Sequence, residues 1–289
     1  MKIRNKIMIA SLTVAFPIIG VGGYLDYILT AEKLEEDVLE QLNSIASIQK
    51  QRVIESIENN FDKLNGVTSR TQLRESLEQF NLDQNTQDKL KIEKIILDAK
   101  SSIDDIEEVF ILNSSGDVIF STSAKFENKS FEGTEIFEKG YAKNHLSLSI
   151  SDETPVLMIS GPLLLNDKHL GVAVIKTPTQ TLSKITSDYT SLGKSGESFM
   201  AKRDSNGDAL FITSLRFDDD SFLKRTIPKE RTDVPITQAL LKNESIFKEK
   251  VDYRGVPVLS ATKYIEQMDW GLAVKIDRSE AFATLEYIG

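Results

Sequence analysis

An apolar run near the N-terminus passes without a break into a long charged helical segment, and this continuity constrains the fold more than any other feature. The run covers residues 7–29, and as a helix it would be roughly 34 Å long, enough to cross the hydrocarbon core of a bilayer. Lys2, Arg4 and Lys6 precede it, which predicts a cytoplasmic N-terminus at residues 1–6 and an exported remainder. We expect an uncleaved transmembrane anchor, because the apolar region of a cleavable signal peptide is shorter, about 7–15 residues.

A helical stalk is predicted over residues 30–66. Apolar residues recur there at spacings of mostly three and four, and neither proline nor glycine interrupts the pattern before Gly66. A helix of about 36 residues would be roughly 54 Å long, more than a compact domain ordinarily contains. Two interpretations stay open: the apolar stripe packs on the chain's own domain, or it pairs with a second copy in a homodimer.

After the stalk, the sequence predicts two α+β lobes in series, over residues 67–180 and 181–280. Both contain short alternating segments, typical of antiparallel strands, on either side of glycine-containing turns. The turns at Asn113–Asp117 and Asp204–Asp208 show that the second lobe repeats the first in outline. Residues 281–289 again have a helical pattern, and we expect them to begin a helix that leads to a second membrane span.

Composition excludes several classes of function. The chain has no cysteine and only two histidines, His145 and His169, which removes thiol chemistry and Cys-ligated metals and leaves little for a histidine metal site. A net charge of −9 without a basic block argues against a nucleic-acid partner. Gly193-Lys194-Ser195 lacks the earlier glycine of a P-loop and is expected to form a turn that enters a strand. We therefore expect no catalytic residues, no metal and no cofactor.

Three parts of the sequence resemble the double Cache (dCache, PAS-like) sensor domains of bacterial transmembrane receptors. They are Ser69–Arg74 after the long helix, Leu192–Phe199 at the start of the second lobe, and the closing strands Val251–Leu259 and Met268–Asp277. The resemblance implies an α+β fold in which a long N-terminal helix, preceded by a transmembrane helix, carries two PAS-like antiparallel-sheet lobes. The first lobe would be distal to the membrane and the second proximal to it.

The resemblance also implies a function, which is signal transduction rather than catalysis. The chain would be the periplasmic ligand-sensing region of a receptor in the bacterial inner membrane, most simply a two-component sensor histidine kinase. Such sensors also serve diguanylate cyclases and chemoreceptors, so these outputs stay open, as does an anchored module that binds a periplasmic protein. A likeness of fold does not choose among them.

In double Cache sensors the ligand lies between the distal sheet and the connection over it, here about residues 125–144. Many amino-acid-sensing relatives end the last distal strand with an Asp that accepts the ligand's ammonium group, whereas this chain has Lys176 there. A lysine in a partly desolvated cup favours an anion, so an organic carboxylate is the expected ligand; a solvated lysine at a strand end is the alternative. We call the connection over the sheet, about residues 125–144, the lid. Strand alternation and the return of the lid to the sheet give the other candidate ligand-binding residues: Tyr141, His145, Ser147, Met158 and Ser160.

Overall fold

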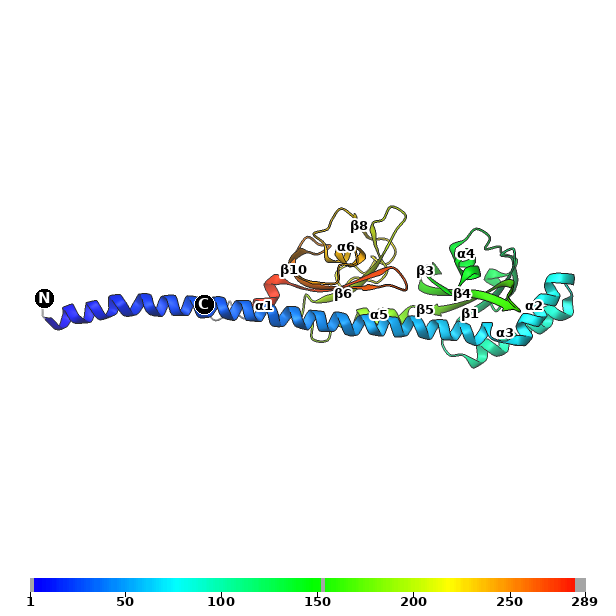
Figure 1. Cartoon of the computed structure of the whole chain (residues 1–289), viewed down its shortest axis with the longest axis horizontal. Helices are drawn as coiled ribbons and strands as arrows, with labels where there is room; N and C mark the ends of the chain where they lie inside the picture. Colours follow the sequence, from blue (N-terminus) through cyan, green and yellow to red (C-terminus); the bar gives the residue numbers. More distant parts are fainter. Residues whose placement is uncertain (1–2, 152–153, 284–289) are drawn as a thin grey trace.

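The computed structural model describes residues 3–151 and 154–283, with side chains from residue 22 onward. One helix, α1 (Ile3–Thr68), runs along the molecule, and both sheets lie on the same side of it (Figure 1). The sheet nearer the N-terminal end of α1 is formed by the later part of the chain, and the sheet farther along it by the earlier part. The long N-terminal helix followed by antiparallel sheets confirms the predicted α+β class.

The segments predicted to cross or approach the membrane lie near the two ends of the chain. In the part of the chain that the structure describes, no helix contains a segment both long and apolar enough to cross a membrane. Residues 7–21 of the predicted span lie outside the residues whose side chains are described. The C-terminal helix α7 covers Arg278–Ala281, and residues 284–289 of the predicted helix lie outside the described residues.

Two helices, α2 (Thr71–Asp83) and α3 (Thr86–Ser102), form a hairpin beyond the distal end of the sheets (Figure 1). The turn between them depends on two residues. Gln84 has a φ of 52°, and the side chain of Asn85 caps α3 by accepting a hydrogen bond from the Gln87 N–H at 2.9 Å. The sequence pattern predicts helices over about residues 68–80 and 85–103, and the observed ends differ from these by one to three residues.

The distal sheet contains five antiparallel strands in the order β2-β1-β5-β4-β3. Its strands are β1 (Glu108–Asn113), β2 (Val118–Ser121), β3 (His145–Ser151), β4 (Thr154–Leu165) and β5 (Lys168–Pro178). The sequence pattern predicts strands at residues 107–112, 118–122, 146–150, 156–165 and 169–176, so all five were expected. The connection over the outer face contains two short helices that the sequence pattern did not predict, η1 (Ala124–Phe126) and α4 (Glu135–Ala142).

The proximal sheet follows the linking helix α5 (Gln180–Thr186) and has the strand order β8-β7-β6-β11-β10-β9. Its strands are β6 (Glu197–Arg203), β7 (Ala209–Phe211), β8 (Thr226–Ile227), β9 (Ile246–Val251), β10 (Pro257–Ile265) and β11 (Trp270–Asp277). Helix α6 (Pro235–Leu240) covers the outer face. The sequence pattern missed only β8, because two residues are too few to show alternation.

A continuous hydrophobic core joins α1 to the inner faces of both sheets. Leu42, Val53, Ile57 and Leu64 of α1 are buried in it, so one stripe of the stalk packs on the chain's own lobes. A second stripe is covered less well, and Ile48 on it is 59% exposed. Val38 and Ile45 beside it are partly buried and pack against the same core, so pairing of the stalk with a second copy stays a prediction.

Candidate functional site

Five of the six predicted ligand-binding residues lie on one face of the distal sheet. Lys176 in β5 is paired with Met158 in β4, and Met158 is paired with Ser147 in β3. The next row toward α4 contains His145, which is paired with Ser160. The antiparallel register therefore brings together residues that are up to 31 positions apart in the sequence (176 − 145), on the face opposite α1.

Lys176 is buried and already has anionic partners. Its side chain is 8% exposed, and its Nζ donates to Glu108 Oε1 at 3.1 Å and lies 3.5 Å from Glu107 Oε2. Burial acts to lower the pKa of Lys176, but the two carboxylates outweigh it and hold this pKa above its ordinary value. Lys176 is therefore charged but not free. A ligand anion would have to replace one carboxylate, and Glu107, whose side chain is 44% exposed, is the weaker partner.

Several buried polar atoms on this face have no hydrogen-bond partner within the described part of the chain. They are Glu108 Oε2, Ser160 Oγ and His145 Nε2. His145 Nε2 lies 3.4 Å from Glu135 Oε1, but burial lowers the pKa of His145 and favours the neutral ring. A buried polar group without a partner costs about 1–3 kcal/mol, so water or the polar groups of a ligand would stabilise the site.

The lid lies close against the sheet. A Cβ atom at Gly140 of α4 would be 2.3 Å from Ser160 Oγ, so glycine is required for this approach. Phe110 of β1 stacks on Phe126 and Phe131 of the lid segment, with ring centroids 4.8 and 5.1 Å apart. These rings fill the cup on the side of β1, so any ligand space must open through movement of the lid.

Tyr141 is the predicted site residue that the structure does not bring to Lys176. Its ring stacks on His169 at a centroid distance of 4.5 Å. His169 precedes Lys176 by seven positions in the same strand, which corresponds to roughly 23 Å at about 3.3 Å per residue. Tyr141 thus covers the opposite end of β5.

The proximal lobe repeats the lysine–glutamate pair in a fully buried form. Lys275 of β11 is paired with Glu197 of β6, as Lys176 of β5 is paired with Glu108 of β1. Sequence reasoning missed these pairs, although the repeat was visible. Both first strands begin with Glu-x-Phe, and the pairing strands contain Ala-Val-Ile-Lys and Ala-Val-Lys two residues before their ends.

Three carboxylates surround Lys275 Nζ, which is completely buried. The distances are 3.2 Å to Asp252, 3.3 Å to Asp277 and 3.4 Å to Glu197. Tyr253 donates its hydroxyl to Glu197, and burial raises the pKa of the Glu197 carboxyl in spite of Lys275 nearby. The Lys275 ammonium group occupies the position among these carboxylates where a metal cation would otherwise bind. Within residues 3–151 and 154–283, no group of histidines and carboxylates is arranged to hold a metal ion.

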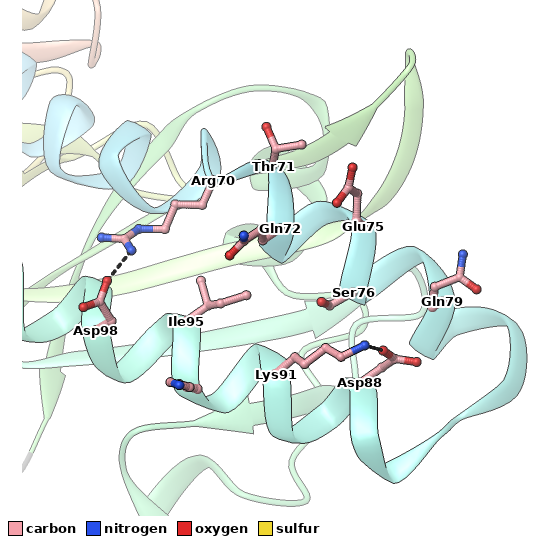
Figure 2. Close-up of a pocket in the computed structure, with 11 residues that line it drawn as sticks. Arg70, Thr71, Gln72, Glu75, Ser76, Gln79, Asp88, Lys91, Ile95 and Asp98 are labelled. Carbon is pink, nitrogen blue, oxygen red and sulfur yellow. Dashed lines mark hydrogen bonds and ion pairs between the residues drawn. The ribbon is translucent and has the colours of Figure 1, made fainter.

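A groove of about 760 Å³ lies between α2 and α3, away from the predicted site (Figure 2). Four of its charged side chains pair with one another: Arg70 with Asp98 at 2.6 Å, and Lys91 with Asp88 at 2.8 Å. Glu75 and Lys94 also line the groove and form no ion pair within the described part of the chain. None of the six predicted ligand-binding residues lines this groove.

Two antiparallel-sheet lobes in series on one long helix, each with a helix over its outer face, define a tandem sensor fold of the PAS-like class. The sequence model of the Cache domain family, dCache_1, matches residues 30–285. The chain belongs to this family, and the predicted resemblance to double Cache sensor domains is confirmed.

Solved structures with this fold are sensor domains of two kinds of receptor. The Vibrio cholerae histidine kinase DctB sensor domain has 12% identity and a TM-score of 0.61, covering 84% of this chain and 98% of that one. The ligand-binding domain of the Campylobacter jejuni chemoreceptor Tlp3, in complex with 4-methylisoleucine, has 14% identity and a TM-score of 0.59, covering 86% and 94%. The Pseudomonas aeruginosa PAO1 amino acid chemoreceptor PctC, in complex with GABA, has 17% identity and a TM-score of 0.59, covering 83% and 100%. A comparison with curated protein sequences gave no match. At these identities the likeness shows the fold alone.

Proposed function

We propose that this chain is the periplasmic ligand-sensing region of a bacterial membrane receptor and that its distal lobe binds a small organic carboxylate. The observation that carries the proposal is the group of buried polar atoms around Lys176 that lack a partner within the described residues, on a face covered by the lid. The complexes of Tlp3 with 4-methylisoleucine and of PctC with GABA support a small-molecule ligand in this fold.

The charges around Lys176 narrow the ligand class. A ligand carboxylate would replace Glu107 at Lys176 Nζ, while Glu108 stays in place at 3.1 Å. Glu108 Oε2 lacks a partner within the described residues and would accept a hydrogen bond from an amino group of the same ligand. One lysine beside two glutamates leaves a net charge of −1, so a carboxylate that also carries an ammonium group fits this site better than a dianion.

Membrane attachment and receptor type form the second part of the proposal. Side chains from Tyr24 to Leu29 are exposed, with Tyr24 at 65% and Leu29 at 64%, as expected for a surface that a bilayer interface would cover. We favour a sensor histidine kinase as the receptor, with a diguanylate cyclase, a chemoreceptor or an anchored module for a periplasmic protein as alternatives. A reporter enzyme fused after Gly289 should be active outside the cytoplasm; cytoplasmic activity would overturn the topology.

A homodimer through α1 completes the proposal. Beside the buried stripe of α1, at spacings of four, seven and three, lie Leu34, Val38, Ile45 and Ile48. Val38 and Ile45 also pack partly against the chain's own core. None of the four is fully buried by the chain itself. This spacing is that of a helix seam that pairs with a second copy.

The test of the ligand proposal uses Lys176→Ala and a matched control. A thermal-shift screen of the chain against carboxylates, amino acids, amines, sugars and purines should give a carboxylate hit, and calorimetry would then measure its Kd. Loss of a charge-assisted hydrogen bond should weaken binding about 10- to 150-fold. Lys168→Ala is the control, because Lys168 lies in the same strand and pairs with Glu78 at the surface. An amine hit without a carboxyl group, or equal affinities of both variants, would refute the site.

A further inference from the structure

Most polar contacts between the C-terminal helix α7 and the proximal lobe are made by a single carboxylate, and Arg278 of α7 adds one hydrogen bond to the Lys248 carbonyl oxygen at 3.1 Å. Glu280 of α7 accepts hydrogen bonds from the backbone N–H groups of Lys194 at 2.7 Å and Ser195 at 2.6 Å, and from the Ser195 hydroxyl. We call the turn Gly193–Ser195, which binds this carboxylate, the cradle. It is the Gly-Lys-Ser segment that lacks the earlier glycine of a P-loop. Gly193 has a φ of +67°, and a Cβ atom there would be 2.6 Å from Glu280 Oε1. The cradle therefore requires glycine in order to admit the carboxylate.

The cradle is connected to the buried charge cluster of the proximal lobe. Ser195 accepts hydrogen bonds at its carbonyl oxygen from Lys275 Nζ, at 2.9 Å, and at its Oγ from the Asp277 N–H, at 3.1 Å. Lys275 is completely buried among carboxylates. One side of the cradle is thus fixed to the interior of the lobe, whereas Gly193 and Lys194 on the other side are exposed.

A loop over the cluster holds the same cradle. Arg216 donates to the carbonyl oxygens of Gly193 at 3.1 Å and Gly196 at 2.6 Å. The neighbouring Phe217 lies over the guanidinium of Arg254 and the ammonium group of Lys275, with its ring centroid 4.2 and 5.1 Å away. Phe217 is nevertheless 45% exposed. Movement of this loop would act on the cradle directly through Arg216.

The contacts between α7 and the long helix are much weaker. Arg278 of α7 lies 3.8 Å from Glu35 of α1, outside hydrogen-bond distance. Glu35 Oε1 is buried without a hydrogen-bond partner in the described part of the chain. The bidentate seat of Glu280 is therefore the strongest polar attachment of α7 among the described residues, and it holds α7 to the proximal lobe rather than to α1.

We propose that Glu280 is a releasable latch: seated in Gly193–Ser195 it holds α7 on the proximal lobe, and its departure frees α7 while both sheets stay folded. The structural part of this inference is independent of the proposed sensor function. Only the role of the release depends on that function: the freed α7 would transmit the signal out of the lobes. The latch is suited to this role because one carboxylate in a partly exposed cradle makes most of its polar contacts, while only Ala281 and its neighbour Phe282 pack on the hydrophobic core. The buried cluster around Lys275, by contrast, cannot open without separating several ion pairs.

Hydrogen exchange on the full chain in detergent tests the latch residue by residue. In the wild-type protein, the amides of Lys194, Ser195 and Ala283 should exchange through a local opening, long before those of β11. Glu280→Gln should raise exchange at these amides about 10- to 150-fold, the expected effect of losing a charge-assisted hydrogen bond, and leave β11 protected. Glu266→Gln is the matched control, because Glu266 pairs with Lys242 at the surface and touches neither α7 nor the cradle.

A second variant attacks the latch from the other side and leaves the carboxylate intact. Gly193→Ala places a methyl group in the cradle and should raise exchange at the same amides as Glu280→Gln. Unchanged exchange in both variants would overturn the latch, and so would equal deprotection of β11, which would mean that Glu280 only supports folding. Ligand binding is measured separately on the same samples. A wild-type chain that binds no carboxylate refutes the proposed ligand but not the latch.

Discussion

Replacement of Lys275 by methionine should destabilise the folded protein strongly, although methionine fills nearly the same volume. In the wild-type protein Lys275 Nζ lies 3.2–3.4 Å from three carboxylates, and the Glu197 and Asp252 side chains are, like Lys275, completely buried. Without the ammonium group these carboxylates keep only Arg254 as a cationic partner, on Asp252 and Asp277. Removing one partner of a buried ion pair costs about 3–5 kcal/mol. We expect a loss of that size in the free energy of unfolding.

Urea denaturation followed by circular dichroism measures this loss. With a slope of about 2.5–3 kcal/mol per molar urea, the midpoint should fall by about 1–2 M. The matched control is Lys176→Met, where the two glutamates are 17% and 44% exposed and can be hydrated, so its cost should be nearer 1–2 kcal/mol. The double variant Lys275→Met/Glu197→Gln should recover part of the loss. A cost below about 1 kcal/mol for Lys275→Met, or no recovery in the double variant, would refute the reasoning.

Three further predictions follow from the same structure. Burial raises the pKa of Glu197 in the folded state, so the contribution of this residue to stability falls as the pH rises through that raised pKa. The stability of Glu197→Gln relative to wild type should therefore be greater at about pH 8 than at about pH 5. Ser160→Ala removes a buried hydroxyl without a described partner and should leave the ligand-free protein as stable or up to about 1 kcal/mol more stable, while weakening ligand binding; a thermal shift of the opposite sign would show that the hydroxyl is satisfied. Ile48→Glu changes a side chain that is 59% exposed and should weaken self-association in sedimentation with an unchanged melting temperature, whereas unchanged association would exclude this stripe as the dimer surface.

Sequence reasoning predicted local structure well where a segment was long enough to show several repeats of the helix or strand period. The distal strands and the helices α2 and α3 were expected within a few residues of their observed ends, because alternation and capping act over neighbouring positions. Strand β8 was not recognised because two residues are too few to show alternation, and helix α4 was also missed.

In the candidate site, too, sequence reasoning gave the local arrangement but missed contacts between segments that are far apart in the sequence. Sequence reasoning expected Met158 and Ser160 of the neighbouring strand to lie near Lys176, and the strand register pairs Met158 with Lys176 and Ser160 with Val174. It gave no sign that Glu107 and Glu108 already neutralise Lys176, because those residues lie almost 70 positions earlier and meet it only through the pairing of β1 with β5. It also placed Tyr141 with Lys176, whereas the stacking on His169 holds Tyr141 at the other end of the strand.

The sequence alone thus determined the α+β class, the long helix and the two repeated lobes, since these follow from hydrophobic periodicity and glycine-containing turns. Only the tertiary structure decided which charges are free. Lys176 and Lys275 lie near the ends of similar strands, but Lys176 keeps one partly exposed partner, whereas Lys275 is buried among three carboxylates beneath Phe217. The difference arises because the energy of a charge depends on its distance from other charges and from water, and strand pairing and loop packing fix both only after the chain has folded.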